Sequence, residues 1–316
     1  MLFADPVARP ASARCGVPEH ASLASLASLG LDENHRGSFP PSRPSRRLRW
    51  PRAIGAVLGW LAGSVLRIRR AHVEASMRAA GIEHAAAQAR AMYAALGASA
   101  VEFLWLAWGG ARALEHVRID EASVGPWRAA LGRGRGVVVA ASHTGNWDLA
   151  ACAVAREVEL LVVTKRLSVR WMDRVWQSTR AALGVRLAEA RGALARGREV
   201  LRRGGAVAMM IDQVPLSRRH ALPVEFLGRT AMTDRAPAAL AASAGAPLVV
   251  AAARREPDGG HVLCVLDVVV PPPRASRAWI DQATLAATGA LDRFVRAHPS
   301  QWLWLHRRWK PMLPRP

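Results

Sequence analysis

The feature that most limits the fold of this chain is an alternation of short apolar runs with helical patterns after residue 136. The apolar runs predict strands at residues 137–141, 160–163, 206–211, 247–252 and 262–270. Helical patterns separate most of them, at residues 149–158, 170–183, 193–203, 236–243 and 283–297. The strand runs are continuously apolar, which is typical of parallel strands covered on both faces. We therefore predict an α/β fold with a mostly parallel central sheet flanked by helices.

The sequence divides into three segments, and the strand-and-helix pattern lies in the last of them. Residues 1–46 are rich in Pro, Ser, Arg and Ala, which predicts a disordered leader or an over-long gene start. Residues 47–82 form an apolar and basic helical segment, and residues 83–316 hold a further helix near 83–108 and the α/β domain.

The helix predicted at residues 53–66 has two unlike faces. These residues carry no charge, arginines flank them, and Gly55, Gly59 and Gly63 line one side. Apolar side chains recur at helical spacing on the other side: Ile54, Val57, Leu58, Leu61, Val65 and Ile68. Such a helix can anchor a protein in a membrane interface, or it can be a buried core helix, since it has core-helix length. No run reaches the roughly 18 apolar residues of a spanning helix, and no secretory signal is recognisable.

The overall charge predicts a polyanionic partner. The formal net charge is +20, and all but two of the 44 basic residues are arginines. Anionic lipid, nucleic acid and an acidic carrier protein all suit this balance, although a GC-rich genome produces the same arginine bias. The three cysteines are far apart and match neither a zinc site nor a disulfide framework, which favours a reducing, cytosol-facing location.

The segment from residue 142 to 148 is the strongest candidate for chemistry. It reads Ser-His-Thr-Gly-Asn-Trp-Asp and leaves a predicted strand to enter a helix, where α/β proteins gather catalytic groups. His143 can take a proton from an attacking hydroxyl, while Asp148 would fix its tautomer. Asn146 is a plausible helix N-cap. The pairs His116/Glu121 and His220/Glu225 share the spacing but lack the strand, so we interpret them as surface polar pairs.

Other strand ends carry further polar candidates. Asp212 and Gln213 follow the strand predicted at residues 206–211, where the carboxylate could orient a catalytic group or cap a turn. Residues 223–233 suit a loop that closes over an acyl or phosphate group. Cations that could hold phosphate follow a strand or precede a helix, namely Lys165, Arg166 and Arg191.

The C-terminal stretch at residues 298–310 alternates with period two. Trp302, Trp304 and His306 would share one face, with leucines on the other. Tryptophan interleaved with arginine suits a membrane interface, cation–π packing or single-stranded nucleic acid. The simplest interpretation is a closing strand packed on the sheet.

Taken together, these motifs resemble the bacterial lipid A biosynthesis (lauroyl/myristoyl-type) acyltransferases, within the glycerol-3-phosphate and lysophospholipid acyltransferase superfamily. Residues 143–148 look like the family's His-x-x-x-x-Asp/Glu motif, and residues 211–213 like its Asp-Gln strand end. Residues 223–228, 233–246 and 301–310 are similar to three further family segments. The resemblance covers roughly residues 50–312, with Asp148 in place of the more common Glu.

The resemblance implies a glycerol-3-phosphate acyltransferase-like catalytic domain over residues 83–316 and an O-acyltransferase activity. A fatty acyl chain would pass from acyl carrier protein or coenzyme A to a hydroxyl of a glycolipid such as a lipid A precursor. His143 would be the general base and Asp148 its partner, with no metal or resident cofactor. Substrate-binding positions implied by the family are Asn146, Lys165, Arg166, Arg191, Asp212, Gln213, Phe226 and Gly228. The expected location is the cytoplasmic face of the bacterial inner membrane.

Three alternatives remain open at this point. The acceptor could be a lysophospholipid, a mannosylated lipid or a lipid-like product of a biosynthetic cluster. The chain could instead be a basic nucleic-acid-binding protein, although no helix-turn-helix, zinc or RRM pattern supports this. It could also be a catalytically silent relative that binds lipid as a partner subunit.

Overall fold

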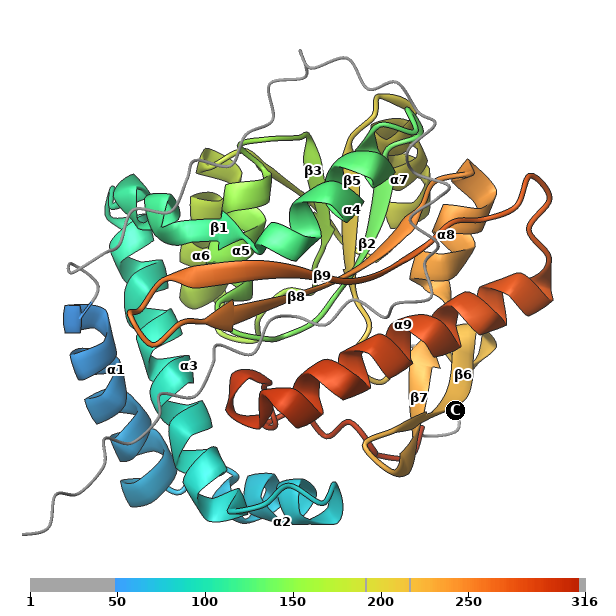
Figure 1. The fold of residues 1–316 in the computed structure, drawn as a ribbon. Coiled ribbons are helices and arrows are strands. Elements are labelled where there is room, and N and C mark those ends of the chain that lie inside the picture. The colour runs from blue at the N-terminus through green and yellow to red at the C-terminus, as the bar shows by residue number, and fades with distance from the viewer. Residues whose placement is uncertain (1–48, 191, 216, 313–316) are drawn as a thin grey trace, which may run out of the picture.

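A seven-stranded sheet organises the computed structural model, which describes residues 49–190, 192–215 and 217–312 (Figure 1). The predicted leader at residues 1–46 lies outside these ranges. The strands, in chain order, are β1 (Val117–Ile119), β2 (Val137–Ala141), β3 (Leu160–Val163), β4 (Val185–Ala188), β5 (Ala206–Met210), β8 (Leu248–Arg255) and β9 (His261–Val269). Their order across the sheet is β1-β9-β8-β2-β5-β3-β4. Since β8 and β9 form the one antiparallel neighbouring pair in this sheet, the predicted mostly parallel α/β fold is confirmed.

Helices cover both faces of the sheet, as the continuously apolar strands require. The helices are α1 (Arg49–Trp60), α2 (Arg70–Ala79), α3 (Ala85–Ala107), α4 (Glu121–Leu131), α5 (Trp147–Val154), α6 (Arg170–Ala182), α7 (Ala193–Arg202), α8 (Ala236–Ala244) and α9 (Arg277–Ala297). Side chains of α4 and α5 pack on one face, with Val137 and Val139 of β2. Side chains of α7, α8 and α9 pack on the other, with Val138 and Ala140. Strand β2 thus contributes alternate residues to two separate cores.

Helix α1 packs alongside α3 at one side of the molecule (Figure 1). A π-helical turn, Leu61–Val65, continues it, so the helix predicted at residues 53–66 is confirmed. Its glycine side lies so close to α3 that a Cβ on Gly55 would stand 2.2 Å from the backbone nitrogen of Ala98. The opposite apolar side is exposed, with Val57 at 63%. The alternative of a buried core helix is therefore wrong for this face. Within the described ranges, no helix combines the length and apolarity needed to cross a bilayer.

The structure corrects two sequence predictions near the C-terminal half. Residues 223–233, expected as a loop, belong to an antiparallel hairpin of β6 (Ala221–Phe226) and β7 (Arg229–Asp234). The segment after residue 298 is not a closing strand. It has a short 3-10 turn, Pro299–Gln301, and one isolated bridge, between Trp302 and Thr144. Trp302 and Trp304 are both buried. The alternation of residue types in this segment therefore corresponds to alternate burial, and the segment is not a strand of the sheet.

Strands β1 and β4 were also missed by the sequence analysis. Strand β1 has only three residues, which is too short for a periodic signal. Strand β4 includes the exposed Arg186, because it lies at the edge of the sheet. Edge strands tolerate such charged side chains, and these interrupt the apolar run that predicts a strand.

Candidate active site

The candidate site forms where two neighbouring strands end. Strands β2 and β5 are parallel, and Ala141 pairs with Met210 at their carboxyl ends. His143 and Asp212 each follow two residues later, so the sheet brings them to the same edge. His143 Nδ1 lies 2.9 Å from Asp212 Oδ1, and the backbone N–H of His143 donates to Asp212 Oδ2 over 2.7 Å. The carboxyl edge of the sheet thus holds a His–Asp pair, as expected for the functional edge of such folds.

The Asp212 carboxylate is fully buried and held from several sides. The indole N–H of Trp302 donates to Oδ2 over 3.0 Å, so the C-terminal segment closes over the pair. Burial opposes ionisation of this group. The adjacent His143 imidazole outweighs that effect, and the pKa of Asp212 lies well below its usual range. Asp212 is therefore an ionised acceptor for the Nδ1–H of His143, and in a neutral ring this hydrogen bond leaves the lone pair on Nε2.

The free side of His143 faces Gln213 and His306. The Gln213 amide nitrogen lies 3.4 Å from His143 Nε2 and 3.3 Å from His306 Nε2. Burial and the neighbouring His143 lower the pKa of His306 to about 4, so His306 is neutral near pH 7. The amide N–H groups of Gln213 can donate to a lone pair on Nε2 of either imidazole. Nε2 of His143 therefore lies on the side of the ring away from Asp212.

Among the described residues, the hydrogen-bond partners of the Asp148 carboxylate are on α6, and His143 is not one of them. The Asp148 carboxylate forms a buried ion pair with Arg180 of α6, whose Nε donates to Oδ1 over 2.8 Å. The indole N–H of Trp176 donates to the same oxygen over 3.0 Å. The carboxylate observed on the His143 ring is therefore that of Asp212, whereas the carboxylate of Asp148 is observed on Arg180. The catalytic role given to Asp148 stays a prediction.

The remaining predicted site residues lie at different distances from this centre. Asn146 is buried and caps α5, with its side-chain oxygen accepting from the N–H of Leu149 over 3.2 Å. Phe226 is buried against the Trp302 ring, and Gly228 is in the turn between β6 and β7. The site therefore brings together His143, Asn146, Asp212 and Gln213. Phe226 contacts this group only through Trp302, and Gly228 lies outside it.

A basic groove lies at the carboxyl ends of β3 and β4, with a volume of about 1010 Å³. Its cations are Arg166, Arg170, Arg174 and Arg196, and the exposed Lys165 precedes the first of them. Arg166 is paired with Glu189 through a 2.7 Å contact, and both side chains are largely exposed. Predicted site residue Arg191 lies outside the described residues. The groove offers more positive than negative charge to an anionic group.

An apolar cavity of about 110 Å³ lies on one face of the sheet, next to the turn at residues 142–148. Ser142 and Trp147 reach it from the turn, and Arg180 is its charged residue. Its other walls are apolar side chains of β1, β2, β3, β5, β8, β9, α4 and α5, among them Val139, Leu160, Met210 and Trp127. Burial raises the pKa of the Cys152 thiol, in the same core, to about 12, so this cysteine is not a thiolate nucleophile.

The comparison with known families agrees with this geometry. The bacterial lipid A biosynthesis acyltransferase family matches residues 48–311. The chain belongs to this family. Two curated relatives are phosphatidylinositol mannoside acyltransferases. One, from Mycobacterium tuberculosis (strain ATCC 25618 / H37Rv), is 28% identical over 57% of this chain and 57% of its own length. One, from Mycolicibacterium smegmatis, is 25% identical over 62% of this chain and 66% of its own length. The match therefore spans less than two thirds of either relative.

The sequence analysis missed the partners that complete the site. His306 and Trp302 were placed on one face of an expected strand, and Arg180 was not singled out. The missed relation between His143 and Asp212 had a signal, since both residues follow an apolar strand. The sequence does not show the order of the strands in the sheet, and it is this order that makes β2 and β5 neighbours.

Proposed function

We propose that this protein is an O-acyltransferase that moves a fatty acyl chain from a thioester donor to a hydroxyl of a membrane glycolipid. The single observation that carries the proposal is the buried Asp212 carboxylate on His143 Nδ1, which leaves Nε2 as a base at the carboxyl edge of the sheet. Membership of an acyltransferase family supports the same reaction. This pairing also speaks against a catalytically silent relative.

In the proposed mechanism, His143 Nε2 takes the proton of the acceptor hydroxyl as its oxygen attacks the thioester carbonyl carbon. Asp212 stabilises the imidazolium that forms. The amino end of α5 offers backbone N–H groups to the oxyanion of the tetrahedral intermediate. The carbon–sulfur bond then breaks, and the imidazolium returns its proton to the leaving thiolate. The step is complete with these groups, and no resident cofactor is part of the proposal.

The apolar cavity and the arginine-lined groove suit the two ends of a lipid substrate. The apolar cavity next to Ser142 and Trp147 supports binding of part of the acyl chain there. The arginine-lined groove supports binding of an anionic group, either on the donor (acyl carrier protein or coenzyme A) or on the acceptor. Both assignments are part of the proposal.

The surface of α1 supports a membrane location. Its exposed apolar side chains and nearby arginines suit the boundary between acyl chains and phosphates. We propose that the protein acts at the cytoplasmic face of a bacterial inner membrane, held by this helix. In the C-terminal segment Trp302 and Trp304 are buried and offer no stacking surface to nucleic acid, so this segment does not support the nucleic-acid alternative.

Two glycolipid acceptors deserve a direct comparison. The family description points to a lipid A precursor, and the names of the two relatives point to a phosphatidylinositol mannoside. Either supplies a sugar hydroxyl within a membrane-bound lipid. We propose a glycolipid of this kind as the acceptor.

The test incubates the purified protein with acyl carrier protein and coenzyme A thioesters of several chain lengths. The acceptors are an under-acylated lipid A precursor and a phosphatidylinositol mannoside, and mass spectrometry follows the lipid. We expect a gain of one acyl mass with the wild type and with His220→Ala, which removes an exposed histidine, but at least about 10²-fold slower transfer with His143→Ala. Transfer by His143→Ala at the wild-type rate would refute the proposed base.

A further inference from the structure

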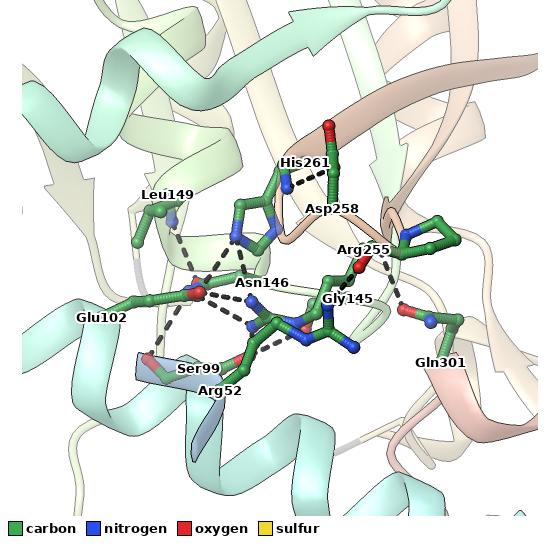
Figure 2. Close-up of polar contacts among 12 residues, drawn as sticks. Arg52, Ser99, Glu102, Gly145, Asn146, Leu149, Arg255, Asp258, His261 and Gln301 are labelled. Carbon is green, nitrogen blue, oxygen red and sulfur yellow. Dashed lines mark hydrogen bonds and ion pairs between the residues drawn. The ribbon is translucent and has the colours of Figure 1, made fainter. Parts of the chain in front are cut away.

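A buried polar cluster joins α3 to the hairpin of β8 and β9 behind the catalytic turn (Figure 2). At its centre is Glu102, which is fully buried. Arg255 forms a two-point ion pair with this carboxylate, and Arg255 Nη2 donates to Oε2 over 2.8 Å. His261 Nε2 lies 3.1 Å from the same oxygen. The cluster is outside the His143–Asp212 pair, and the proposed mechanism does not use its groups directly.

The charges of this cluster are balanced. Burial opposes ionisation of Glu102, but the hydrogen bonds from His261 and Arg255 outweigh it and lower its pKa to about 2. Burial lowers the pKa of His261, so this ring is neutral and donates through Nε2. One carboxylate thus faces one guanidinium. A buried ion pair contributes little net stability compared with apolar packing of the same volume. We therefore ask which neighbouring groups the Glu102–Arg255 pair holds in position.

What the carboxylate holds is the turn that carries His143. The side-chain amide of Asn146 donates to Glu102 Oε2 over 2.8 Å, while its oxygen caps α5 (Figure 2). Ser99, one turn before Glu102 on α3, donates to the carbonyl of Gly145 over 3.5 Å. Arg255 reaches the turn through its backbone as well, since its N–H donates to the Gln301 side chain, and the Gln301 carbonyl accepts from Gly145.

The backbone of the turn at residues 142–148 is tightly constrained. Gly145 has a positive φ of 54°, and a Cβ there would stand 2.6 Å from the carbonyl oxygen of Ala253. The carbonyl of His143 accepts from Leu303, and its N–H donates to Asp212. Contacts from α3, β8 and the C-terminal segment thus fix both sides of His143. A catalytic base must be held to within a fraction of an ångström of its working position.

We propose that Glu102 is a positioning residue for acyl transfer: through Asn146 it sets the conformation of the turn and hence the alignment of His143 with Asp212. The inference rests on the proposed function, because it assigns Glu102 to the same site. Glu102 touches no reacting atom, and its direct contact with the turn is the amide of Asn146.

The test exchanges the two hydrogen-bonding partners. Asn146→Asp keeps the oxygen that caps α5 but sets a second carboxylate against Glu102. Glu102→Gln leaves Arg255 without its carboxylate. The double variant restores one donor, one acceptor and one negative charge, and neutral His261 can change tautomer to accept from the new amide. We expect each single variant to lower kcat by about 10-fold to 100-fold with KM little changed, and the double variant to recover most of that loss.

A matched control separates positioning from general stability. Asp281→Asn makes the same carboxylate-to-amide change in the half-buried ion pair with Arg235, which links α8 and α9 away from the turn. It should lower the Tm and leave kcat unchanged. Wild-type kcat in Asn146→Asp, or a double variant no faster than the slower single variant, would overturn the proposal. A loss of activity that only follows the Tm across all variants, the control included, would do the same.

A second readout does not depend on activity. In protein labelled with ¹⁵N-histidine, the Nδ1–H signal of His143, assigned by its loss in His143→Ala, reports the hydrogen bond to Asp212. We expect this signal to shift or broaden in both single variants and to return in the double variant. An unchanged signal in the single variants would contradict positioning. If the wild type transfers no acyl chain, the proposed function fails, and this signal still decides whether Glu102 aligns His143.

Discussion

At the residue scale, the two carboxylates near His143 have different partners and different expected effects. Asp212 accepts from the His143 ring and backbone and from Trp302. Asp148, five residues after His143, pairs with Arg180 below α5. Asp212 therefore controls the state of the proposed base, whereas Asp148 ties α5 to α6.

Replacing Asp212 by Asn removes the acceptor that fixes the His143 tautomer. We expect kcat to fall by about 10²-fold to 10⁴-fold with a small change in KM, since the base is then misoriented and its imidazolium loses a counter-charge. Steady-state kinetics with a thioester donor measures both constants.

The comparison variant is Asp148→Asn. It leaves the Arg180 guanidinium buried without its carboxylate, which costs about 3–5 kcal/mol of unfolding free energy. Chemical denaturation measures that loss. If Asp148→Asn lowered kcat as much as Asp212→Asn in protein that is still folded, the assignment of partners would be wrong.

At the element scale, α1 and α3 can pack closely because α1 has glycines, which carry no side chain, where it faces α3. Gly55, Gly59 and Gly63 each lie where a Cβ would overlap α3, and at the first two of them it would meet backbone atoms. Backbone cannot move aside by a change of rotamer, so the two helices must separate if a side chain is added. Glu102 and Ser99 of α3 contact Asn146 and Gly145, so the packing of α1 on α3 also supports the helix behind the turn at residues 142–148.

Gly59→Ala should therefore destabilise the protein despite the better helix propensity of alanine. The new Cβ would stand 2.3 Å from the carbonyl oxygen of Tyr93, and relief of this overlap costs about 1–3 kcal/mol. The same substitution at Gly289 of α9, where the nearest side-chain atom is 3.7 Å away, should stabilise the protein by about 0.5–1 kcal/mol. Thermal unfolding of the two variants measures effects of opposite sign, and equal shifts would contradict the close helix contact.

At the scale of the whole molecule, exposed apolar side chains gather with positive charge. The helix α1 and the turn after it expose apolar side chains, and so does the first half of α6 with Trp171, Met172 and Val175. Both helices pack against α3. With a net charge of +20, a surface of this kind favours adsorption to an anionic membrane.

Val57→Asp should weaken binding to vesicles that contain anionic phospholipid without lowering the Tm, because Val57 is 63% exposed and faces away from α3. Leu194→Asp is the control, since it adds the same charge at an exposed leucine on α7. Co-sedimentation measures both, at low and at high salt. Wild-type binding should fall as salt rises, because the arginines contribute about 1 kcal/mol each near a charged surface. Equal binding by Val57→Asp and the wild type would remove α1 from the membrane contact.

The sequence alone determined most of the elements and the strand ends at which polar residues collect. Continuous apolar runs report strands buried on both faces, and this signal is local, so β2, β3, β5, β8 and β9 were predicted close to their observed bounds. His143, Asp212 and Gln213 were identified as candidates for the same reason. Short or edge strands such as β1 and β4 gave too weak a local signal.

Only the tertiary structure decided which of these residues meet. The partner of His143 depends on β5 lying beside β2, and strand order comes from contacts between segments far apart in the sequence. The same holds for Glu102, which lies 44 residues before Asn146 and yet holds its amide. Spacing along the chain favoured Asp148, whereas the parallel register of β2 and β5 selected Asp212, because a sheet aligns strand ends whatever the length of chain between them.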